Sequence, residues 1–383
     1  MSRGEEILIV GGGIAGMTAA AAIARQGFAV TLLESAPEFG EIGAGVTLTP
    51  NAMRGLDFIG VCEEAAAVGV EPTLQRIQHW QDGRTLVGFD RSTQRATYGA
   101  PYITIHRADL HAVLTKAARD AGVDMRTNAA AVSSEGTTVT LADGSTVSGD
   151  LLVGADGVKS VIRQRFEPAR PHFTGHVAWR TLVPVTPDLQ DLSDHPGIII
   201  GPGAMINRYN VRHSTIMNLV FFARQEGWNQ EGWTTPVDPG ELRSIYAGWC
   251  DDAQRQIEAA CKQPMFKWAI NARRPLDNWI IDGNVTLLGD AAHAMTPFLG
   301  QGAACGIEDA VVLARALAAA GSIAEALDRY VAARHERATF IQTESNANAD
   351  RMQGQDTDLF GLEGLRNEES LGLFDYDPRT VAV

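Results

Sequence analysis

The residues most suited to chemistry are a group of glycines near the start of the chain. An apolar run, residues 7–10, leads directly into residues 11–16 (GGGIAG), which have the spacing G-x-G-x-x-G. In such a turn the first glycine permits the tight bend, the second lets the backbone approach a pyrophosphate, and the third lets the next helix lie close to the sheet. Free N–H groups at the helix N-terminus then bind phosphate. The predicted contact residues are Gly11, Gly13, Ile14, Ala15 and Gly16.

An acidic residue follows where a dinucleotide site requires one. Residues 17–26 predict an alanine-rich helix that Gly27 ends, and residues 29–33 predict a second strand. Glu34 stands at the tip of this strand, about twenty positions after the glycines, where a carboxylate accepts a hydrogen bond from a ribose hydroxyl. We include Ser35 in the same site. An ordinary tight turn is the alternative interpretation of a lone glycine motif, and the motif does not distinguish FAD from NAD.

Two further motifs each place an aspartate just beyond an apolar strand. Residues 154–163 (GADGVKSVIR) contain Asp156, and residues 289–297 (GDAAHAMTP) contain Asp290. Ligands of open α/β sheets bind at the carboxyl ends of the strands, so both carboxylates could accept hydrogen bonds from sugar-like hydroxyls. Capping a helix or forming a turn is the alternative role for each aspartate.

Together the three motifs resemble those of the single-component FAD-dependent aromatic hydroxylases. This group includes the p-hydroxybenzoate, salicylate, 3-hydroxybenzoate and 6-hydroxynicotinate monooxygenases. Residues 43–46 (GAGV), 102–107 (YITIHR) and 300–302 (GQG) are most similar to the salicylate and 6-hydroxynicotinate branch. The resemblance implies a mixed α/β fold like that of p-hydroxybenzoate hydroxylase: a Rossmann-like FAD-binding domain, an inserted antiparallel-sheet substrate domain and a C-terminal helix.

The resemblance also implies roles for individual residues in binding FAD. Arg107 would contact the phosphate and ribityl region, Asp290 would bind ribityl hydroxyls, and Asp156 would lie where flavin and nicotinamide meet. The helix predicted over residues 301–320 would direct its positive N-terminus at the flavin. The other implied FAD contacts are Gly45, Val46, Gly157, Gly289, Pro297, Gly300, Gln301, Gly302 and Ala303. Because FAD would occupy the one fingerprint, NADH or NADPH would bind transiently. Glycines 43, 45 and 300 would leave room for the flavin to move.

The implied reaction is hydroxylation of a phenolic or hydroxypyridine ring that carries a carboxylate. NAD(P)H would reduce FAD and O2 would form a flavin C4a-hydroperoxide, while decarboxylation stays open. On the strand predicted over residues 205–209, alternation places Met205, Asn207 and Tyr209 on one face, and Arg208 would form a surface salt bridge on the other. The predicted substrate-binding residues are Thr47, Met205, Asn207, Tyr209 and Pro297, and the predicted catalytic residues are Pro297, Gln301, Tyr209 and Thr47.

No catalytic base is assigned from the sequence. The 6-hydroxynicotinate enzymes have a histidine where this chain has Thr47, and the 3-hydroxybenzoate enzymes have one near the position of Met205. Two other functions stay open: different flavin chemistry on the same fold, such as halogenation or prenyl reduction, and a non-catalytic flavin-binding redox sensor. The W-x-W-x-I-type signature of halogenases is not found in the sequence.

Composition narrows the partners. The chain has 383 residues and a net charge of −14, and its sequence contains no cluster of basic residues that could neutralise phosphates. A nucleic-acid or anionic-membrane partner is therefore not expected. No apolar run reaches the roughly 20 residues that would span a membrane. The four cysteines form no C-x-x-C pair, which predicts reduced thiols in a cytoplasmic protein and no metal site.

The order of predicted elements suggests two interleaved domains. The FAD-binding domain takes residues 1–73, 101–170 and 273–322, and the substrate domain takes a hairpin, 74–100, and an antiparallel sheet, 171–272. Residues 323–383 form a C-terminal helix, expected at 323–352, and a tail. The tail could pack across a homodimer through its apolar residues, which are Leu359, Phe360, Leu371, Leu373, Phe374 and Tyr376.

Overall fold

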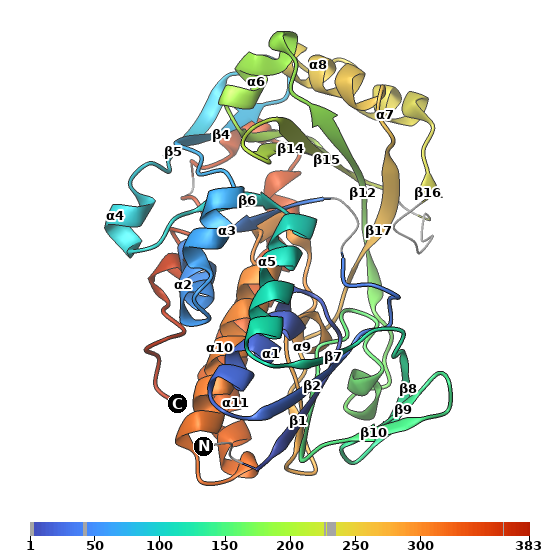
Figure 1. Cartoon of the computed structure of the whole chain (residues 1–383). Coiled ribbons are helices and arrows are strands. Elements are labelled where there is room, and N and C mark those ends of the chain that lie inside the picture. Colours follow the sequence, from blue (N-terminus) through green and yellow to red (C-terminus); the bar gives the residue numbers. More distant parts are fainter. Residues whose placement is uncertain (1–3, 41–43, 226, 228–234, 363) are drawn as a thin grey trace.

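Two sheets, one above the other in Figure 1, organise the chain. The computed structural model describes residues 4–40, 44–225, 227, 235–362 and 364–383, so the predicted loop glycine at position 43 lies outside the described residues. Within these ranges the first sheet has six strands in the order β18-β19-β11-β1-β2-β7, and the second has eight in the order β16-β17-β12-β15-β14-β13-β4-β5.

The first sheet is parallel except at one edge. Its strands are β1 (Glu6–Val10), β2 (Ala29–Leu33), β7 (Asp124–Arg126), β11 (Leu151–Gly154), β19 (Val285–Leu287) and the antiparallel edge strand β18 (Ile280–Ile281). The inner strands β1, β2, β11 and β19 are short, mostly apolar runs, as expected where a sheet is buried on both faces. The chain therefore returns to this sheet after it has built the second one, and the three motifs meet at its carboxyl ends.

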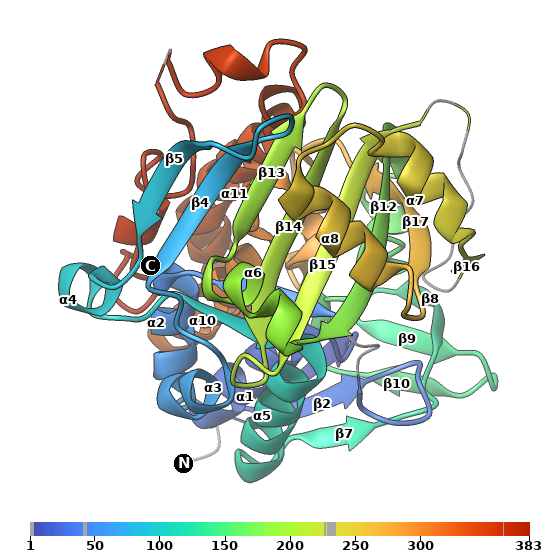
Figure 2. The same cartoon turned by 90° about the horizontal axis from the view of Figure 1, so that it is seen from above.

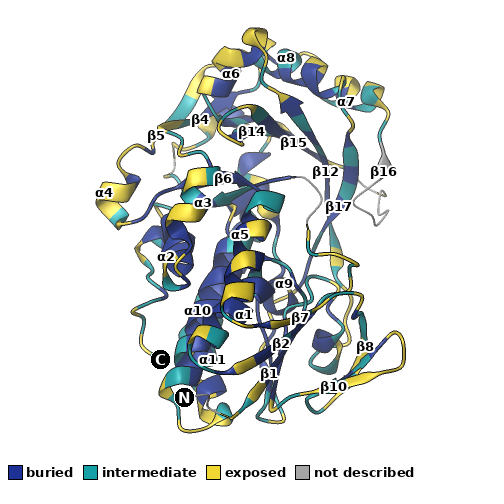
Figure 3. Ribbon diagram, in the orientation of Figure 1, coloured by how far each residue is buried: buried dark blue, intermediate teal, exposed yellow. Residues whose placement is uncertain are grey.

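Long helices cover the first sheet. They are α1 (Ile14–Arg25), α5 (Arg107–Asp120), α10 (Gly302–Ala319) and α11 (Ile323–Met352). The expected helices at 107–121, 301–320 and 323–352 are confirmed to within a residue at each end. Figure 3 shows α10 buried along most of its length. It packs closely against α1, since a Cβ on Gly306 would lie only 2.8 Å from the Ala15 Cβ. Glycine at position 306 permits this close approach.

The second sheet is buried on both faces. Its strands are β4 (Leu74–His79), β5 (Thr85–Asp90), β12 (His172–Pro184), β13 (Gly197–Gly201), β14 (Ala204–Val211), β15 (Ile216–Arg224), β16 (Thr235–Pro236) and β17 (Phe266–Ala272). In Figure 2, α7 (Pro239–Ile245) and α8 (Asp251–Ala260) cross one face. The other face shares an apolar cluster with Phe298, which belongs to the loop after β19.

The strand pairs within residues 172–272 are antiparallel, as predicted, and one parallel pair joins the hairpin of β4 and β5 to them. Strand β13 pairs in parallel with β4, which comes from a segment more than a hundred residues earlier. Hairpin turns set the antiparallel pairs, such as β14 with β15, but no local signal sets the pairing of distant segments.

Shorter elements lie between and around the two sheets. They are β3 (Gly45–Leu48) paired with β6 (Ile103–His106), the ribbon β8 (Ala131–Glu135), β9 (Thr138–Leu141) and β10 (Thr146–Ser148), and the helices α2 (Pro50–Phe58), α3 (Cys62–Val68), α4 (Gln94–Tyr98), α6 (Gln190–Asp194) and α9 (Asp290–His293). The sequence did not predict α3 or α4. Across the described ranges, no helix combines the length and the apolar character needed to cross a membrane.

The expectation that Arg208 forms a surface salt bridge is wrong. Alternation does place it opposite Tyr209, but α6 and α8 cover that face, and Arg208 is 1% exposed. Its Nε donates to the Leu192 carbonyl at 3.1 Å, and one terminal nitrogen donates to Gln78 Oε1 at 3.0 Å. Burial lowers its pKa to about 10.

The tail packs on its own chain, so the expectation that Leu373 and Phe374 serve a dimer is wrong. Both side chains are buried, and the Phe374 ring meets the Tyr98 ring edge-on at 5.4 Å. Arg54 in α2 donates to the Tyr376 carbonyl at 2.9 Å. Leu359, by contrast, is 55% exposed. The apolar residues of the tail therefore divide between a buried anchor and an exposed stretch.

Candidate active site

The glycine turn combines tight backbone packing with open space. A Cβ on Gly16 would lie 1.9 Å from the Gly11 carbonyl oxygen, and a Cβ on Gly11 would lie 2.3 Å from the Ala155 carbonyl oxygen. Gly13 differs, because no described atom lies within 4 Å of the position its Cβ would take. Two glycines are therefore required for packing, and the third leaves room for a ligand to approach the backbone.

Glu34 is tied to the same turn. One carboxylate oxygen accepts a hydrogen bond from the Gly12 N–H at 2.8 Å, and the other accepts from the Ser35 hydroxyl at 2.9 Å and the Ala36 N–H at 2.8 Å. The carboxylate thus lies beside the glycines, where a ribose hydroxyl of the predicted ligand would need an acceptor.

Two helices begin at this edge of the first sheet without capping side chains. The N-cap residues are Gly13 for α1 and Gln301 for α10, and among the described residues neither helix has a side-chain cap or an acidic residue in its first turn. The first N–H groups of a helix have no partner inside the helix and carry a partial positive charge. The starts of α1 (Ile14, Ala15) and α10 (Gly302, Ala303) therefore suit an anionic, hydrogen-bonding ligand such as FAD.

The two motif aspartates lie in different environments. Asp290, the first residue of α9, is exposed, as are Pro297 and Gly300, so its carboxylate faces open space. Asp156 instead accepts hydrogen bonds from the Ser160 hydroxyl at 2.5 Å and the Val161 N–H at 2.6 Å. The turn-forming role left open for Asp156 is therefore observed, and its contact with a cofactor stays a prediction. Beside it, Gly157 has φ +75°, and no described atom lies near its Cβ position.

Tyr209 in the second sheet meets the start of β3. A Cβ on Gly45 would lie 2.3 Å from the Tyr209 Cε2, and the Gly45 N–H donates to Asn218 Oδ1 at 2.9 Å. Thr47 lies in the same strand as Gly45, near the Tyr102 phenol. The structure thus brings two predicted substrate residues, Thr47 and Tyr209, to one region.

The expected alternation along β14 is confirmed. Met205 lies in the apolar cluster with Phe298, and Asn207 and Tyr209 are half-buried on the same face. Burial raises the pKa of the Tyr209 phenol, while the nearby charges of Arg180 and Arg107 act in the opposite direction. The Tyr209 phenol therefore stays protonated at neutral pH, close to two positive charges.

The loop that carries Pro297 is held from both sides. The Phe298 ring packs against Phe222 of β15 at 5.1 Å and His176 of β12 at 5.2 Å. From α11, Asn348 donates to the Phe298 carbonyl at 2.7 Å. Pro297 is thereby fixed between the second sheet and α11.

The Gln301 side chain points into the protein. It is 1% exposed, and its amide donates to Thr49 Oγ1 and accepts from Asn51 Nδ2, each at 3.2 Å. The predicted contact of Gln301 with a substrate or cofactor therefore rests on its backbone at the start of α10.

Four residues that the sequence analysis did not assign also build this region. They are Tyr102, Asn218, Ser345 and Asn348. Asn218 sits in an apolar strand, and Ser345 and Asn348 sit in a helix segment with unusual polar density (ESNAN, residues 344–348). A buried polar residue usually has a specific hydrogen-bond partner. Polar residues inside apolar elements were therefore the sequence signal that could have indicated these four positions.

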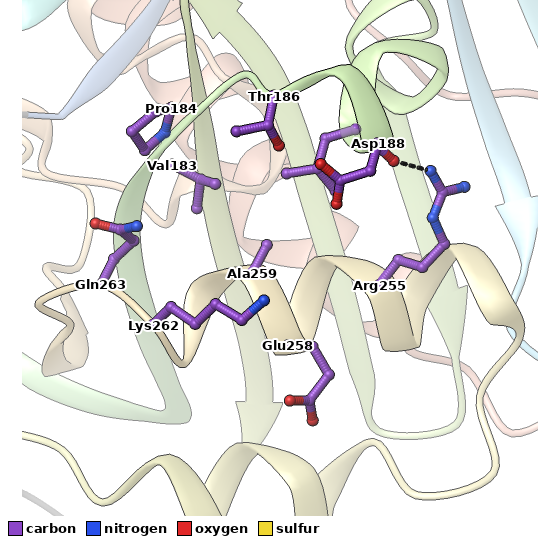
Figure 4. A pocket seen from close by; sticks show the side chains of 10 residues that line it. Val183, Pro184, Thr186, Asp188, Arg255, Glu258, Ala259, Lys262 and Gln263 are labelled. Carbon is purple, nitrogen blue, oxygen red and sulfur yellow. Dashed lines mark hydrogen bonds between the residues drawn. The ribbon is translucent and has the colours of Figure 1, made fainter.

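A surface depression of about 350 Å³ lies elsewhere, between the end of β12 and α8. Figure 4 shows Arg255 beside Asp188 on its rim, with Glu258 on α8 and Lys262 just beyond the end of that helix. The described residues that line it include no member of the candidate site, and charges of both signs surround it. The depression is therefore not part of the candidate active site.

The fold and the two uncapped helix N-termini define an FAD-binding enzyme with a sheet placed over the nucleotide turn. The chain matches the FAD binding domain family over residues 5–345, and it belongs to that family. It is 36% identical over 385 residues to 3-hydroxybenzoate 6-hydroxylase 1 of Aquipseudomonas alcaligenes, covering 97% of this chain and 95% of that protein. It is 33% identical over 365 residues to 6-hydroxynicotinate 3-monooxygenase of Bordetella bronchiseptica, covering 91% and 92%.

Solved structures agree with this assignment. A salicylate hydroxylase substrate complex has a TM-score of 0.84 and 25% identity, covering 98% of this chain and 96% of that one. HpxO of Klebsiella pneumoniae, solved with FAD and uric acid, has the same TM-score and identity, covering 98% and 97%. The predicted fold, the cofactor FAD and the class of FAD-dependent aromatic-ring monooxygenase are confirmed.

Proposed function

We propose that this enzyme hydroxylates an anionic aromatic ring, a phenolic or hydroxypyridine carboxylic acid, with O2 and with NADH or NADPH as the reductant. The observation that carries the proposal is the close approach of Tyr209 in the second sheet to Gly45 in β3, which supports a substrate site between β14 and the strand that carries Thr47. A cytoplasmic location and assembly into a homodimer are part of the same proposal.

The residues at the edge of the first sheet fit FAD. Gly13 would leave space for the pyrophosphate, Glu34 would offer an acceptor to the ribose, and the exposed Asp290 would bind the ribityl hydroxyls. When bound, FAD supplies hydride acceptance and oxygen activation. The N-terminus of α10 stabilises negative charge on the reduced ring system without a charged side chain.

The second sheet supplies the substrate contacts. The protonated Tyr209 phenol can donate a hydrogen bond to a substrate carboxylate, and the charges of Arg180 and Arg107 attract the same group. Thr47, near the Tyr102 phenol, can orient a ring hydroxyl. Met205 and the Pro297 loop add apolar surface that excludes water from the reacting ring.

Replacement of Tyr209 by phenylalanine tests the substrate contact. We expect KM for the aromatic acid to rise about tenfold with little change in kcat, because one hydrogen bond to a charged group is lost while the ring remains. Steady-state kinetics measure the effect. Tyr246→Phe is the matched control, since the Tyr246 hydroxyl is buried on the opposite face, where it donates to the Phe222 carbonyl at 2.8 Å. An equal rise in KM in both variants would contradict this role.

Turnover with a panel of acids tests the function itself. The purified protein with FAD is expected to oxidise NADH or NADPH slowly alone and much faster with 3-hydroxybenzoate, salicylate or 6-hydroxynicotinate. Mass spectrometry with ¹⁸O2 should find one labelled oxygen in the product, and measurement of CO2 shows whether the reaction decarboxylates. Oxidation that is indifferent to every aromatic acid would favour the redox-sensor alternative.

A further inference from the structure

A charged cluster is buried directly behind the start of α10. It consists of Glu308 and Asp309 of α10, Arg334 and Arg337 of α11, and His293 of α9. The Glu308, Asp309 and Arg334 side chains are 0% exposed, and that of His293 is 1% exposed. Charges at this depth are costly unless each one has a partner, so the arrangement calls for an explanation beyond surface solubility.

The members of the cluster are densely paired. Arg334 reaches Glu308 at 2.6 Å and Asp309 at 2.8 Å, and Arg337 reaches Glu308 at 2.8 Å. The second Asp309 oxygen lies 2.6 Å from His293 Nε2. Burial opposes the charged form of His293, but Cys305 and Asp309 outweigh it and raise the pKa of His293 well above its ordinary value. His293, Arg334 and Arg337 therefore face Glu308 and Asp309, with the Cys305 sulfur beside them.

A metal ion does not explain the cluster. His293, Cys305 and Asp309 do place ligand atoms within 4.8 Å of one another. Arg334, however, lies 3.3 Å from Cys305 Sγ and 2.8 Å from Asp309 Oδ1, so a guanidinium already takes the place of a cation.

The cluster connects to the FAD-binding edge in two ways. Asp309 Oδ2 accepts a hydrogen bond at 2.9 Å from the N–H of Gly289, the residue directly before Asp290. Glu308 accepts at 2.7 Å from Asn51, whose amide also reaches Gln301 at the start of α10. The turn at Gly289 is tightly confined as well, because a Cβ there would lie 2.8 Å from the Ala15 Cβ.

We propose that Asp309 and His293 are positioning residues for FAD, a step that rests on the FAD site proposed above. Asp309 holds the Gly289 turn, and with it Asp290, at a set place relative to α10. His293 contributes a positive charge behind the start of α10, which adds to the helix dipole and favours the reduced, negatively charged flavin.

Two variants distinguish the positioning of the Gly289 turn by Asp309 from the effect of the His293 charge. Asp309→Asn has only one acceptor oxygen, so it cannot accept from Gly289 and His293 on one side and from Arg334 Nε on the other. We therefore expect the FAD dissociation constant to rise roughly tenfold or more. His293→Gln keeps a donor for Asp309 but removes one positive charge. It should hold FAD within a few-fold of the parent, while the midpoint potential of the flavin becomes more negative. Fluorescence titration of FAD and spectroelectrochemistry give the two readings, and neither needs a substrate.

Arg208→Met is the matched control, because Arg208 is equally buried but lies on the far face of the second sheet. It should lower thermal stability and leave both FAD readouts unchanged. Nitrogen-15 NMR of the unaltered holoenzyme should show His293 doubly protonated across neutral pH, a result that needs no variant to fold.

The proposal is overturned if Asp309→Asn binds FAD like the parent, if His293→Gln leaves the potential unchanged, or if all three variants lose FAD in step with their stability. A failure of the proposed function looks different, because the FAD titrations would follow the expectation while no aromatic acid is hydroxylated.

Discussion

Gly13→Ala is expected to lose FAD binding by about 100-fold while the protein stays folded, and Gly16→Ala is expected to damage the fold at the same turn. Gly13 has φ −72° and ψ −175°, a conformation that alanine adopts without strain, and no described atom lies within 4 Å of its Cβ position. The added methyl group would therefore meet only the ligand, where the pyrophosphate must approach the backbone.

Gly16 presents the opposite case. Its Cβ would lie 1.9 Å from the Gly11 carbonyl oxygen, which is backbone and cannot rotate away. Alanine inside a helix gains about 1 kcal/mol over glycine in propensity, but a clash of this kind costs roughly 3 kcal/mol or more. The clash wins, so we expect a lower denaturation midpoint for Gly16→Ala.

Urea unfolding and FAD titration distinguish the two variants. Gly13→Ala should unfold like the parent protein without flavin but fail to retain flavin, whereas Gly16→Ala should be unstable even before flavin is added. If Gly13→Ala binds FAD normally, the pyrophosphate does not approach this backbone and the placement of the dinucleotide is wrong.

The nucleotide edge was predictable because its information is local. The glycines, the helix after them and Glu34 lie within one βαβ unit, and each residue type has its own geometric requirement there. The alternation along β14 was predictable for the same reason, since successive side chains of a strand point to opposite faces.

Contacts between residues that are far apart in the sequence were harder to predict. Alternation placed Arg208 correctly on the outer face, but it could not show that α6 and α8 cover that face. Likewise, Gln301 was expected to face the substrate, yet partners from α2 and the residue before it, Asn51 and Thr49, turn its amide inward. What a side chain meets depends on elements that arrive from elsewhere in the sequence.

The tail illustrates the same limit. Its apolar residues suggested a second copy of the chain, because the sequence offered no partner for them nearby. In the structure, Phe374 meets Tyr98, and Arg54 binds the Tyr376 carbonyl, so the partners come from segments about 300 residues earlier. The apolar residues of a segment predict that it packs against another apolar surface, but they do not identify that surface.

Phe298→Ala is expected to destabilise the protein by about 3–5 kcal/mol and to uncouple NAD(P)H oxidation from hydroxylation. The Phe298 ring joins the Pro297 loop to the second sheet through Phe222 at 5.1 Å and His176 at 5.2 Å. Its loss opens a cavity between the loop and the sheet, which admits water to the place where the substrate ring should react. We therefore expect hydrogen peroxide to replace much of the hydroxylated product.

Phe221→Ala provides the matched control. Phe221 is adjacent to Phe222 in β15 and fully buried, but it faces Tyr246 on the other side of the sheet at 5.6 Å. Its loss should cost a similar free energy of unfolding and leave the ratio of product to oxidised NAD(P)H unchanged. That ratio is measured for both variants at a temperature where both are folded. It decides whether the contact of Phe298 with the second sheet only stabilises the protein or also keeps water from the substrate ring. Equal uncoupling in the two would mean that a softened sheet, and not the Phe298 contact, lets water in.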